Sequence, residues 1–149
     1  MGFFDRLTGT RRPEAGIAPR STEDVRAALL GINAPGVPYV VRHATAAERA
    51  DLVAEWRVPE LRLTLRTRMR FVPADRVVRA LDEQWDARER EYGRGHATRV
   101  AREWTYERGP DGRRRRVETL RFDSRDMKNP LRNAVLGAGW TWRGVTFRL

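Results

Sequence analysis

The sequence predicts an α+β fold in which an antiparallel sheet of about five strands, arranged as two hairpins, is flanked by an N-terminal and a C-terminal helix. Between residues 61 and 122, four segments alternate apolar and polar residues, as strands with one buried face do. Turn residues separate the two segments of each pair. One segment with a helical apolar period precedes this region, and another follows it. At 149 residues the chain has the usual length of one domain.

The first 20 residues are expected to be a flexible N-terminal segment before a single α+β domain at 21–149. Phe3, Phe4 and Leu7 give this segment a short apolar start. Residues 8–20 contain two glycines and two prolines among charged residues, a composition typical of an irregular tether. We therefore expect the segment to be dispensable for folding.

The first helix is predicted to begin at Ser21. Ser21 and Asp24 have the spacing of a capping box, with Asp in place of the usual Glu. The apolar residues that follow recur at i, i+3, i+4 and i+7, which gives one stripe facing the core. They are Val25, Ala28, Leu29 and Ile32. Residues 31–38 end the helix, residues 39–42 form a short strand, and residues 45–58 form a helical turn leading into another strand.

The first hairpin is predicted at 61–72 and 77–88, with its turn at 73–75. The register that buries most apolar side chains places Leu65 opposite Trp85 and Arg68 opposite Asp82. A slip by one residue would place Arg68 opposite Leu81, which burial disfavours.

The second hairpin is predicted at 98–108 and 117–122, after a polar loop at 89–95. Its turn is Pro110-Asp111-Gly112, because Pro fixes φ and Gly supplies the left-handed conformation. Asn129 and Pro130 then predict the start of the second helix, which ends at Gly137 or Gly139. Its buried stripe is Leu131, Ala134, Val135 and Ala138.

Residues 140–149 are predicted to form a terminal strand. A bulge at Gly144 would bring Val145 and Phe147 onto the same face as Trp140 and Trp142. The remaining tryptophans, Trp56, Trp85 and Trp104, lie on the apolar faces of predicted strands and are expected in the core.

The formal net charge of +10 comes almost entirely from arginine, because Lys128 is the only lysine. GC-rich genomes favour arginine codons, so part of this excess reflects the host. The positive field would still attract nucleic acid, an anionic lipid surface or an acidic protein partner. The chain has no cysteine, no apolar run of transmembrane length and no secretory signal, which predicts a cytoplasmic location.

The two ends of the chain carry a resemblance. The opening MGFFDRLTGTRRPEAG and the closing KNPLRNAVLGAGWTWRG resemble small actinobacterial proteins of a family of unknown function. This resemblance implies a type of host. It implies nothing about an activity or about site residues.

Two groups of arginines are candidate anion-binding sites. The sharper one lies at the tip of the second hairpin, with Tyr106 on the facing strand, an arrangement suited to phosphate contact and base stacking. Its arginines are Arg113, Arg114, Arg115 and Arg116. The second group lies on the polar side of residues 61–72 and comprises Arg62, Arg66, Arg68 and Arg70.

No catalytic residue, metal site or cofactor is predicted. The chain has two histidines and two serines, and it lacks a nucleophile elbow, a phosphate-binding glycine loop and a paired-histidine motif. Glu83 is the one unusual carboxylate, because the predicted register places it on the apolar face opposite Thr67. There it should pair with an arginine or have its pKa raised by burial.

The sequence therefore predicts a non-enzymatic binding protein that contacts an anionic partner, nucleic acid above all, through its Arg-rich hairpin. The alternative is a protein-interaction or membrane-surface module that docks through Phe3, Phe4 and Leu7. A third reading is a hydrophobic-ligand carrier or an enzyme with a pocket near Glu83.

Overall fold

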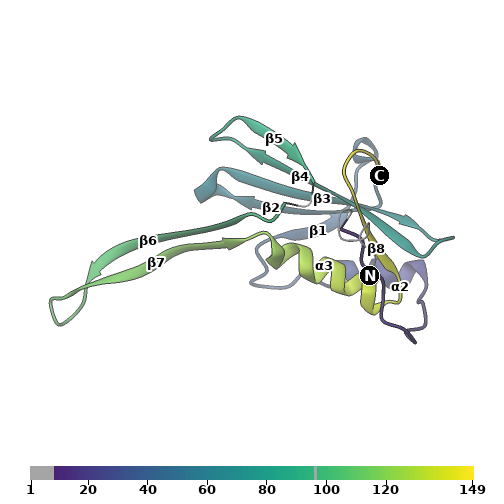
Figure 1. Cartoon of the computed structure of the whole chain (residues 1–149), viewed down its shortest axis with the longest axis horizontal. Helices are drawn as coiled ribbons and strands as arrows, with labels where there is room; N and C mark the ends of the chain where they lie inside the picture. The colour runs from purple at the N-terminus through teal and green to yellow at the C-terminus, as the bar shows by residue number, and fades with distance from the viewer. Residues whose placement is uncertain (1–8, 96) are drawn as a thin grey trace. The chain divides into compact units, whose positions relative to one another are not determined.

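The structure is a computed structural model, and it describes residues 9–95 and 97–149. The fold is α+β, as predicted, and the described residues form two helices, a mostly antiparallel sheet and a separate hairpin. One helix lies near each end of the chain (Figure 1). The chain divides into two compact units, one formed by Met1–His96 with Met127–Leu149 and the other by Ala97–Asp126.

The main sheet belongs to the first unit and has six strands. Five of them follow one another in space: β1 (Val40–His43), β2 (Leu52–Val58), β3 (Leu63–Val72), β4 (Val77–Asp86) and β5 (Glu91–Arg94). The sixth, β8 (Thr141–Val145), also pairs with β4. Residues 77–81 of β4 pair with β8 in parallel, and residues 83–86 pair with β5 in the antiparallel sense.

Helices α2 (Thr22–Leu30) and α3 (Arg125–Gly137) cover one face of this sheet, here called the inner face (Figure 1). Arg26 of α2 lies over the ring of Phe71, and Lys128 of α3 pairs with Asp82 at 3.1 Å. The buried apolar side chains that the sheet contributes to this face are Val41, Leu52, Ala54, Trp56, Val58, Leu63, Leu65, Met69, Phe71, Val78, Ala80 and Trp142. The other face of the sheet is here called the outer face.

The start of α2 agrees with the prediction. The Ser21 hydroxyl accepts a hydrogen bond from the backbone N–H of Asp24 at 3.1 Å, which satisfies one of the free donors of the first turn. Val25 and Leu29 are buried, as predicted, whereas Ala28 is exposed and borders an open hollow between α2 and α3.

Helix α3 begins at Arg125, before the predicted cap at Asn129, so that prediction was wrong. Pro130 lies inside the helix. Because proline has no backbone N–H, it cannot donate the helical hydrogen bond to the carbonyl of Asp126. The earlier start is explained by Met127, which is buried and extends the apolar face of the helix by one turn.

Gly139 ends α3, as predicted. The N–H groups of Gly139 and Trp140 donate to the carbonyls of Leu136 and Val135, which is a Schellman arrangement. Gly139 has φ +77°, and a Cβ atom there would lie 2.8 Å from the Cα atom of Pro19. Glycine is therefore required both by the backbone conformation and by the close approach of a neighbouring segment.

One of the two short 3-10 connections was predicted from the sequence. The helical turn predicted before β2 is the 3-10 helix η1 (Ala46–Glu48), and the Glu48 carboxylate accepts from the N–H of Thr45 at 2.8 Å. A second 3-10 helix, η2 (Pro59–Leu61), precedes β3.

In the N-terminal region, Arg11 exchanges two backbone hydrogen bonds with Trp142.

The predicted register of β3 and β4 is wrong by one residue. Arg68 lies opposite Leu81 and Leu65 opposite Gln84, the arrangement that the burial argument had excluded. The connecting turn has four residues, 73–76, with Arg76 in the left-handed conformation at φ 52°. Because turn length sets the register of a hairpin, this turn decides which side of β4 faces the helices.

The burial of apolar side chains could not predict the register correctly, because β4 is buried on both faces. Val78 and Ala80 face the core, while Leu81 is equally buried on the outer face. The inner face accepts Asp82 because this carboxylate has partners there. The Thr67 hydroxyl lies 2.8 Å from it, in addition to the Lys128 ion pair.

Two smaller predictions need correction. Residues 91–94 form strand β5 instead of lying in a polar loop, and the ring of Tyr92 packs on Trp85 with 5.2 Å between centroids. Gly144 pairs in register with Ala80, so β8 contains no bulge there. Val145 therefore lies on the outer face, opposite in direction to Trp142, and Phe147 is 82% exposed.

Candidate functional site

The second unit is a two-stranded hairpin made of β6 (Val100–Arg108) and β7 (Arg114–Asp123). Its base is closed by the Ser124 hydroxyl, which accepts from the N–H of Arg99 at 2.8 Å. Ser124 thus joins the two strands through its side chain. The backbone N–H of Arg125 donates to the Asp123 carboxylate at 2.9 Å.

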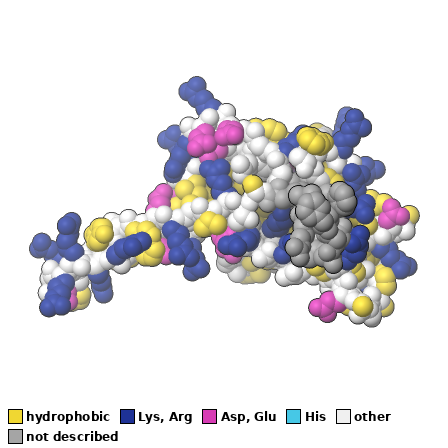
Figure 2. All heavy atoms as spheres, viewed as in Figure 1, with side chains coloured by type: hydrophobic (Ala, Val, Ile, Leu, Met, Phe, Trp, Pro, Cys, Tyr) yellow, Lys and Arg dark blue, Asp and Glu magenta, His cyan; other side chains and the backbone are white. Residues whose placement is uncertain are grey.

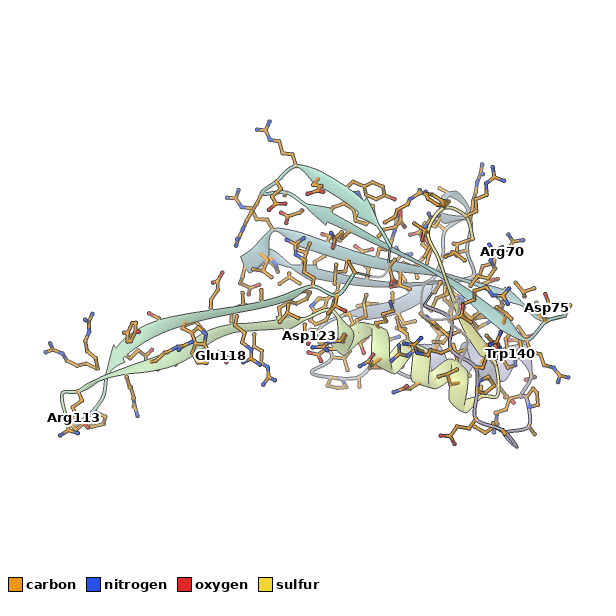
Figure 3. All side chains as sticks on the ribbon, in the orientation of Figure 1. Arg70, Asp75, Arg113, Glu118, Asp123 and Trp140 are labelled. Atoms are coloured by element: carbon orange, nitrogen blue, oxygen red, sulfur yellow. The ribbon has the colours of Figure 1, made fainter. Side chains whose placement is uncertain are left out.

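The tip of the hairpin has the predicted turn. Gly112 has φ +76°, and its N–H donates to the carbonyl of Gly109 at 2.9 Å. The Asp111 side chain accepts from the N–H of Arg113 at 3.0 Å, which adds a second constraint. The sequence therefore builds a well-defined turn directly before its arginine run (Figure 3).

The pairing of β6 with β7 sorts the side chains of the hairpin onto two faces. Tyr106 lies opposite Arg116 and Trp104 opposite Glu118, and a shift in register follows between Glu103 and Trp104. Since residues directly opposite each other share a face, one face carries both rings together with Arg108, Arg114 and Arg116. This face, called the aromatic face below, comprises Trp104, Tyr106, Arg108, Arg114, Arg116 and one acidic residue, Glu118.

Arginines lie over both rings of the aromatic face. The guanidinium of Arg116 is 3.9 Å from the centroid of the Trp104 ring, and that of Arg114 is 5.9 Å from the Tyr106 centroid. Both are diagonal cross-strand contacts, which agrees with the shared face. The rings remain open to solvent, with Trp104 41% and Tyr106 66% exposed.

The charge of the hairpin is concentrated at its tip. Between Tyr106 and Arg116 the sequence has five arginines and two acidic residues. Of these two acids, Glu107 lies opposite Arg115 on the other face, and Asp111 lies in the turn. Among the described residues, none of the four tip arginines forms an ion pair with a carboxylate, and Figure 2 shows arginines gathered at this end of the hairpin. They are Arg113, Arg114, Arg115 and Arg116.

The tip also brings like charges together. Arg108 lies directly opposite Arg114, and such a pair of cations is unfavourable without an anion nearby. All the tip arginines are exposed, so nothing in the hairpin blocks access of a ligand to them. The arrangement can contact phosphates through guanidinium groups and flat ligands through ring faces.

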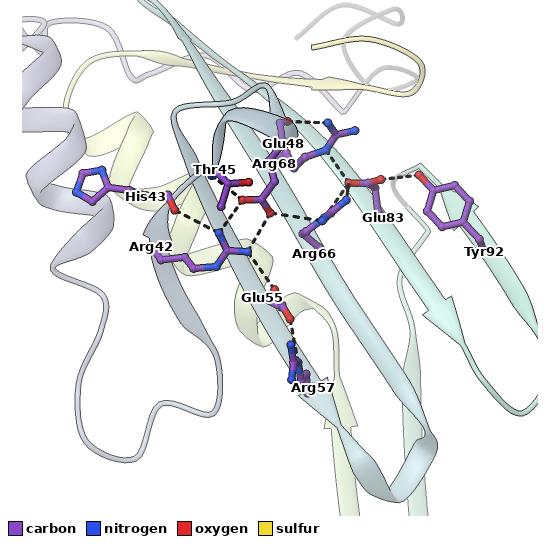
Figure 4. Close-up of polar contacts among 10 residues, drawn as sticks. All are labelled: Arg42, His43, Thr45, Glu48, Glu55, Arg57, Arg66, Arg68, Glu83 and Tyr92. Carbon is purple, nitrogen blue, oxygen red and sulfur yellow. Dashed lines mark hydrogen bonds and ion pairs between the residues drawn. The ribbon is translucent and has the colours of Figure 1, made fainter.

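Two of the four arginines in the second predicted group are paired with carboxylates. Arg66 pairs with Glu83 and Glu48, at 3.1 and 3.4 Å, and Arg68 pairs with Glu83 at 2.7 Å (Figure 4). Arg62 is exposed in a left-handed conformation before β3. The four arginines therefore do not form one open cationic surface. The acids that pair with Arg66 and Arg68 are Glu83 and Glu48, and not Asp82, which the predicted register had placed opposite Arg68.

Glu48 is the centre of this network on the outer face. Arg42 donates to both of its carboxylate oxygens, at 2.7 and 2.9 Å, and also reaches Glu55 at 3.2 Å (Figure 4). The hydrogen bonds from Arg42 lower the pKa of Glu48 from 4.5 to about 2 against the opposing effect of burial. The same contacts raise the pKa of Arg42.

Glu83 does not lie at the position that made it unusual in the predicted register. It lies on the outer face opposite Arg66, and not on the core side opposite Thr67. Burial alone would raise its pKa, but the hydrogen bond from Tyr92 at 2.5 Å and the charges of Arg68 and Arg66 outweigh burial and lower it. Glu83 is therefore an ionised, paired carboxylate, and of the two predicted outcomes it shows pairing.

Three arginines of the outer face hold the C-terminal segment. Arg70 of β3 donates to the carbonyl of Leu149, Arg79 of β4 to that of Arg148, and Arg94 of β5 to that of Phe147. The distances are 3.1, 3.1 and 3.3 Å. Arg70, a predicted anion-binding residue, thus already has a neutral partner.

The residues of the two alternative readings belong to the first unit or lie outside the described residues. Phe3, Phe4 and Leu7 lie outside the described residues, as does His96. Among the residues that are described, no three side chains able to hold a metal ion lie together. No helix of the described chain is long and apolar enough to cross a membrane. The hollow between α2 and α3, about 330 Å³, is lined mainly by alanine and glycine.

Trp104 is the residue of the hairpin that sequence analysis misplaced. It was expected in the core, yet it lies on the exposed aromatic face. The sequence contained a signal for this position, because Trp104 and Tyr106 are two residues apart on one strand and must share a face.

In comparisons with known proteins, no family model, no curated protein and no solved structure matches this chain.

Proposed function

We propose that this protein is a non-enzymatic, cytoplasmic binding protein that contacts nucleic acid through the tip of the β6–β7 hairpin. The observation that supports the proposal most directly is the aromatic face. There, exposed arginines without carboxylate partners lie beside two exposed rings. Nucleic acid is the common ligand that offers both phosphates and flat bases.

The outer face of the main sheet supports the proposal by contrast. Its arginines are mostly held by glutamates or by backbone carbonyls, so their charge is locally compensated or their donors are engaged. Within the described part of the chain, the four tip arginines form no ion pair with a carboxylate. A polyanion is therefore expected to engage the hairpin before the sheet.

The binding is expected to be mainly electrostatic and to show little sequence preference. Each phosphate that an arginine neutralises releases about one counterion, so the logarithm of the affinity should fall linearly with the logarithm of salt concentration. Replacing Arg113, Arg114, Arg115 and Arg116 together by serine should reduce this slope by roughly two to four units.

The test is fluorescence anisotropy of a labelled random oligonucleotide across a salt series. A matched pair of double variants removes two positive charges in each case: Arg114→Ser with Arg116→Ser on the hairpin, and Arg62→Ser with Arg70→Ser on the sheet. The hairpin pair should weaken binding more and flatten the slope more. Equal effects would contradict the assignment to the hairpin, and absence of binding near physiological salt would contradict the proposal.

Anionic phospholipid vesicles are measured in parallel with the oligonucleotide. Binding to vesicles without binding to the oligonucleotide would replace the proposal by the membrane-surface alternative. In that case the arginines would act on lipid headgroups.

A further inference from the structure

The aromatic face supports an inference about the kind of nucleic acid, and this inference rests on the proposed function. Trp104 and Tyr106 are next neighbours on one face of β6, with their rings 41% and 66% exposed. Two residues along a strand cover about 6.8 Å. That distance is about twice the 3.4 Å rise between stacked bases of one nucleic-acid strand. The rings are therefore spaced for the bases of an extended strand.

The rings of Trp104 and Tyr106 cannot stack well on the bases of a duplex. Its base faces are stacked on one another, and only base edges are accessible in its grooves. Side chains that read such edges are chiefly Arg, Lys, Asn and Gln with extended donors. The aromatic face has no Lys, Asn or Gln, and its Arg114 and Arg116 lie over rings instead of extending from the ribbon. Exposed ring faces can stack on bases that are already unstacked.

The arginines are held in place for phosphate contact. A guanidinium that lies over a ring keeps its N–H groups at its edge, where they remain free to bind oxygen. Among the described residues, no acceptor side chain occupies the edges of Arg114 or Arg116. Arg108 lies opposite Arg114 and adds a third cation to the same face.

The opposite face of the hairpin lacks these features. Arg115 lies across from Glu107 there, so its charge has a counterpart, and the residues paired beside them are Thr105 and Val117. The aromatic face carries three arginines and one acid, Glu118, so the two faces of the ribbon differ in ring content and in net charge. This asymmetry makes the aromatic face the side that meets the ligand.

We infer that the hairpin selects single-stranded over double-stranded nucleic acid. Trp104 and Tyr106 stack on bases, and Arg108, Arg114 and Arg116 contact the phosphates between them. Because stacking accepts every base and the face offers no edge-reading pattern, the selection is for the single-stranded state and not for a sequence.

The experiment compares one oligonucleotide of about 16 nucleotides, within the range that single-strand binding sites cover, with the duplex of the same sequence. The full chain should bind the single strand more tightly. Trp104→Leu and Tyr106→Leu should each weaken single-strand binding about tenfold and change duplex binding less than about twofold. Neither variant alters charge, so the salt slope should stay the same. Trp104→Phe should recover most of the affinity, because it restores a ring.

Arg115→Ser and Arg116→Ser provide a matched control, since each removes one charge from a different face. Arg116→Ser should weaken single-strand binding more. Thermal unfolding followed by circular dichroism verifies that each variant is folded, as expected for exposed side chains.

The two possible failures can be distinguished. If the leucine variants weaken both forms equally, or if the duplex binds more tightly, the inference is overturned while the hairpin remains a nucleic-acid contact. If neither form binds, or if the variant with four serines keeps the full salt slope, the proposed function fails and this inference fails with it.

Discussion

The guanidinium of Arg116 lies over the indole ring of Trp104, 3.9 Å from its centroid, and both side chains are exposed. A contact of this kind at an exposed site stabilises a protein by only about 0.5–1 kcal/mol. A tryptophan that is 41% exposed is unusual, because burial of its large ring is the main way in which it contributes to stability. Its exposure is the strongest structural reason to assign the hairpin a ligand.

The first prediction compares Trp104 with Trp142, which is fully buried on the inner face. Trp142→Leu should lower the free energy of unfolding by about 3 kcal/mol or more, because it leaves a cavity in the core. Trp104→Leu should cost less than about 1 kcal/mol. Urea denaturation followed by far-UV circular dichroism measures both values. Similar losses for the two variants would mean that Trp104 belongs to a core after all.

The second prediction concerns acid stability. The pKa of Glu48 is lowered to about 2 in the folded protein, so the folded state binds this proton less readily than the unfolded chain with its pKa of 4.5. The stabilisation is therefore fully present above about pH 4.5 and is lost as the pH falls from there towards about 2. It amounts to about 3 kcal/mol at most.

Glu48→Gln should accordingly destabilise the protein at neutral pH by about 2 kcal/mol, because Arg42 loses its bidentate partner. It should also flatten the dependence of unfolding free energy on pH below about 4.5. Glu14→Gln, at an exposed position, serves as the control. A Glu48→Gln variant with the same acid transition as the unaltered protein would contradict this account.

The alternation in the sequence predicted β3 well and β4 poorly, for a physical reason. Along β3 the apolar side chains lie on one face and the arginines on the other, so a single face could be assigned from the pattern. In β4, Val78 and Leu81 are buried on opposite faces. A strand buried on both sides has no alternation that can set its register, and the four-residue turn decides instead.

The third prediction tests this register with cysteines, which the chain lacks. Arg70 lies directly opposite Arg79, and such Cα atoms are about 4.5–5.5 Å apart, within the range of a disulfide. The variant Arg70→Cys with Arg79→Cys should form a disulfide readily under mild oxidation. Arg70→Cys with Ala80→Cys should not, because Ala80 points to the inner face. A thiol assay after oxidation distinguishes the two, and cross-linking of the second pair alone would restore the register expected from the sequence.

The candidate site could be located from the sequence only in part. Arg113, Arg114, Arg115 and Arg116 with Tyr106 were identified because a run of charges beside a turn is a local signal. The neutralisation of Arg66 and Arg68 could not be predicted, because Glu48 comes from a 3-10 helix and Glu83 from another strand, at a register that was misjudged. Neither a run of charges nor the alternation of apolar and polar residues predicts which distant segments will come into contact.

The fourth prediction concerns Gly139. Gly139→Ala should lower the free energy of unfolding by about 2 kcal/mol or more. The new Cβ would lie 2.8 Å from the Cα of Pro19 and 2.9 Å from the carbonyl oxygen of Ala18, and φ +77° disfavours any side chain. Gly137→Ala is the matched control, because its Cβ would meet nothing within 4 Å. It should be neutral or stabilising by about 0.5–1 kcal/mol. Chemical denaturation checks both values, and equal effects would show that residues 18–19 do not press on the helix end.

The last prediction concerns the segment after β8, which three arginines from three strands bind through its backbone carbonyls. Phe147 is 82% exposed and adds little burial, so these charge-assisted hydrogen bonds are the main anchor of the segment on the sheet. Arg70→Ser combined with Arg79→Ser should therefore release Arg148 and Leu149 while leaving the strands intact. Backbone ¹⁵N order parameters at these residues should fall from about 0.85 towards 0.6 or below. Arg57→Ser, which removes an exposed arginine that pairs with Glu55, should leave them unchanged. Order parameters that stay high in the double variant would mean that Thr146 and Leu149, which are half-buried, hold the segment by packing instead.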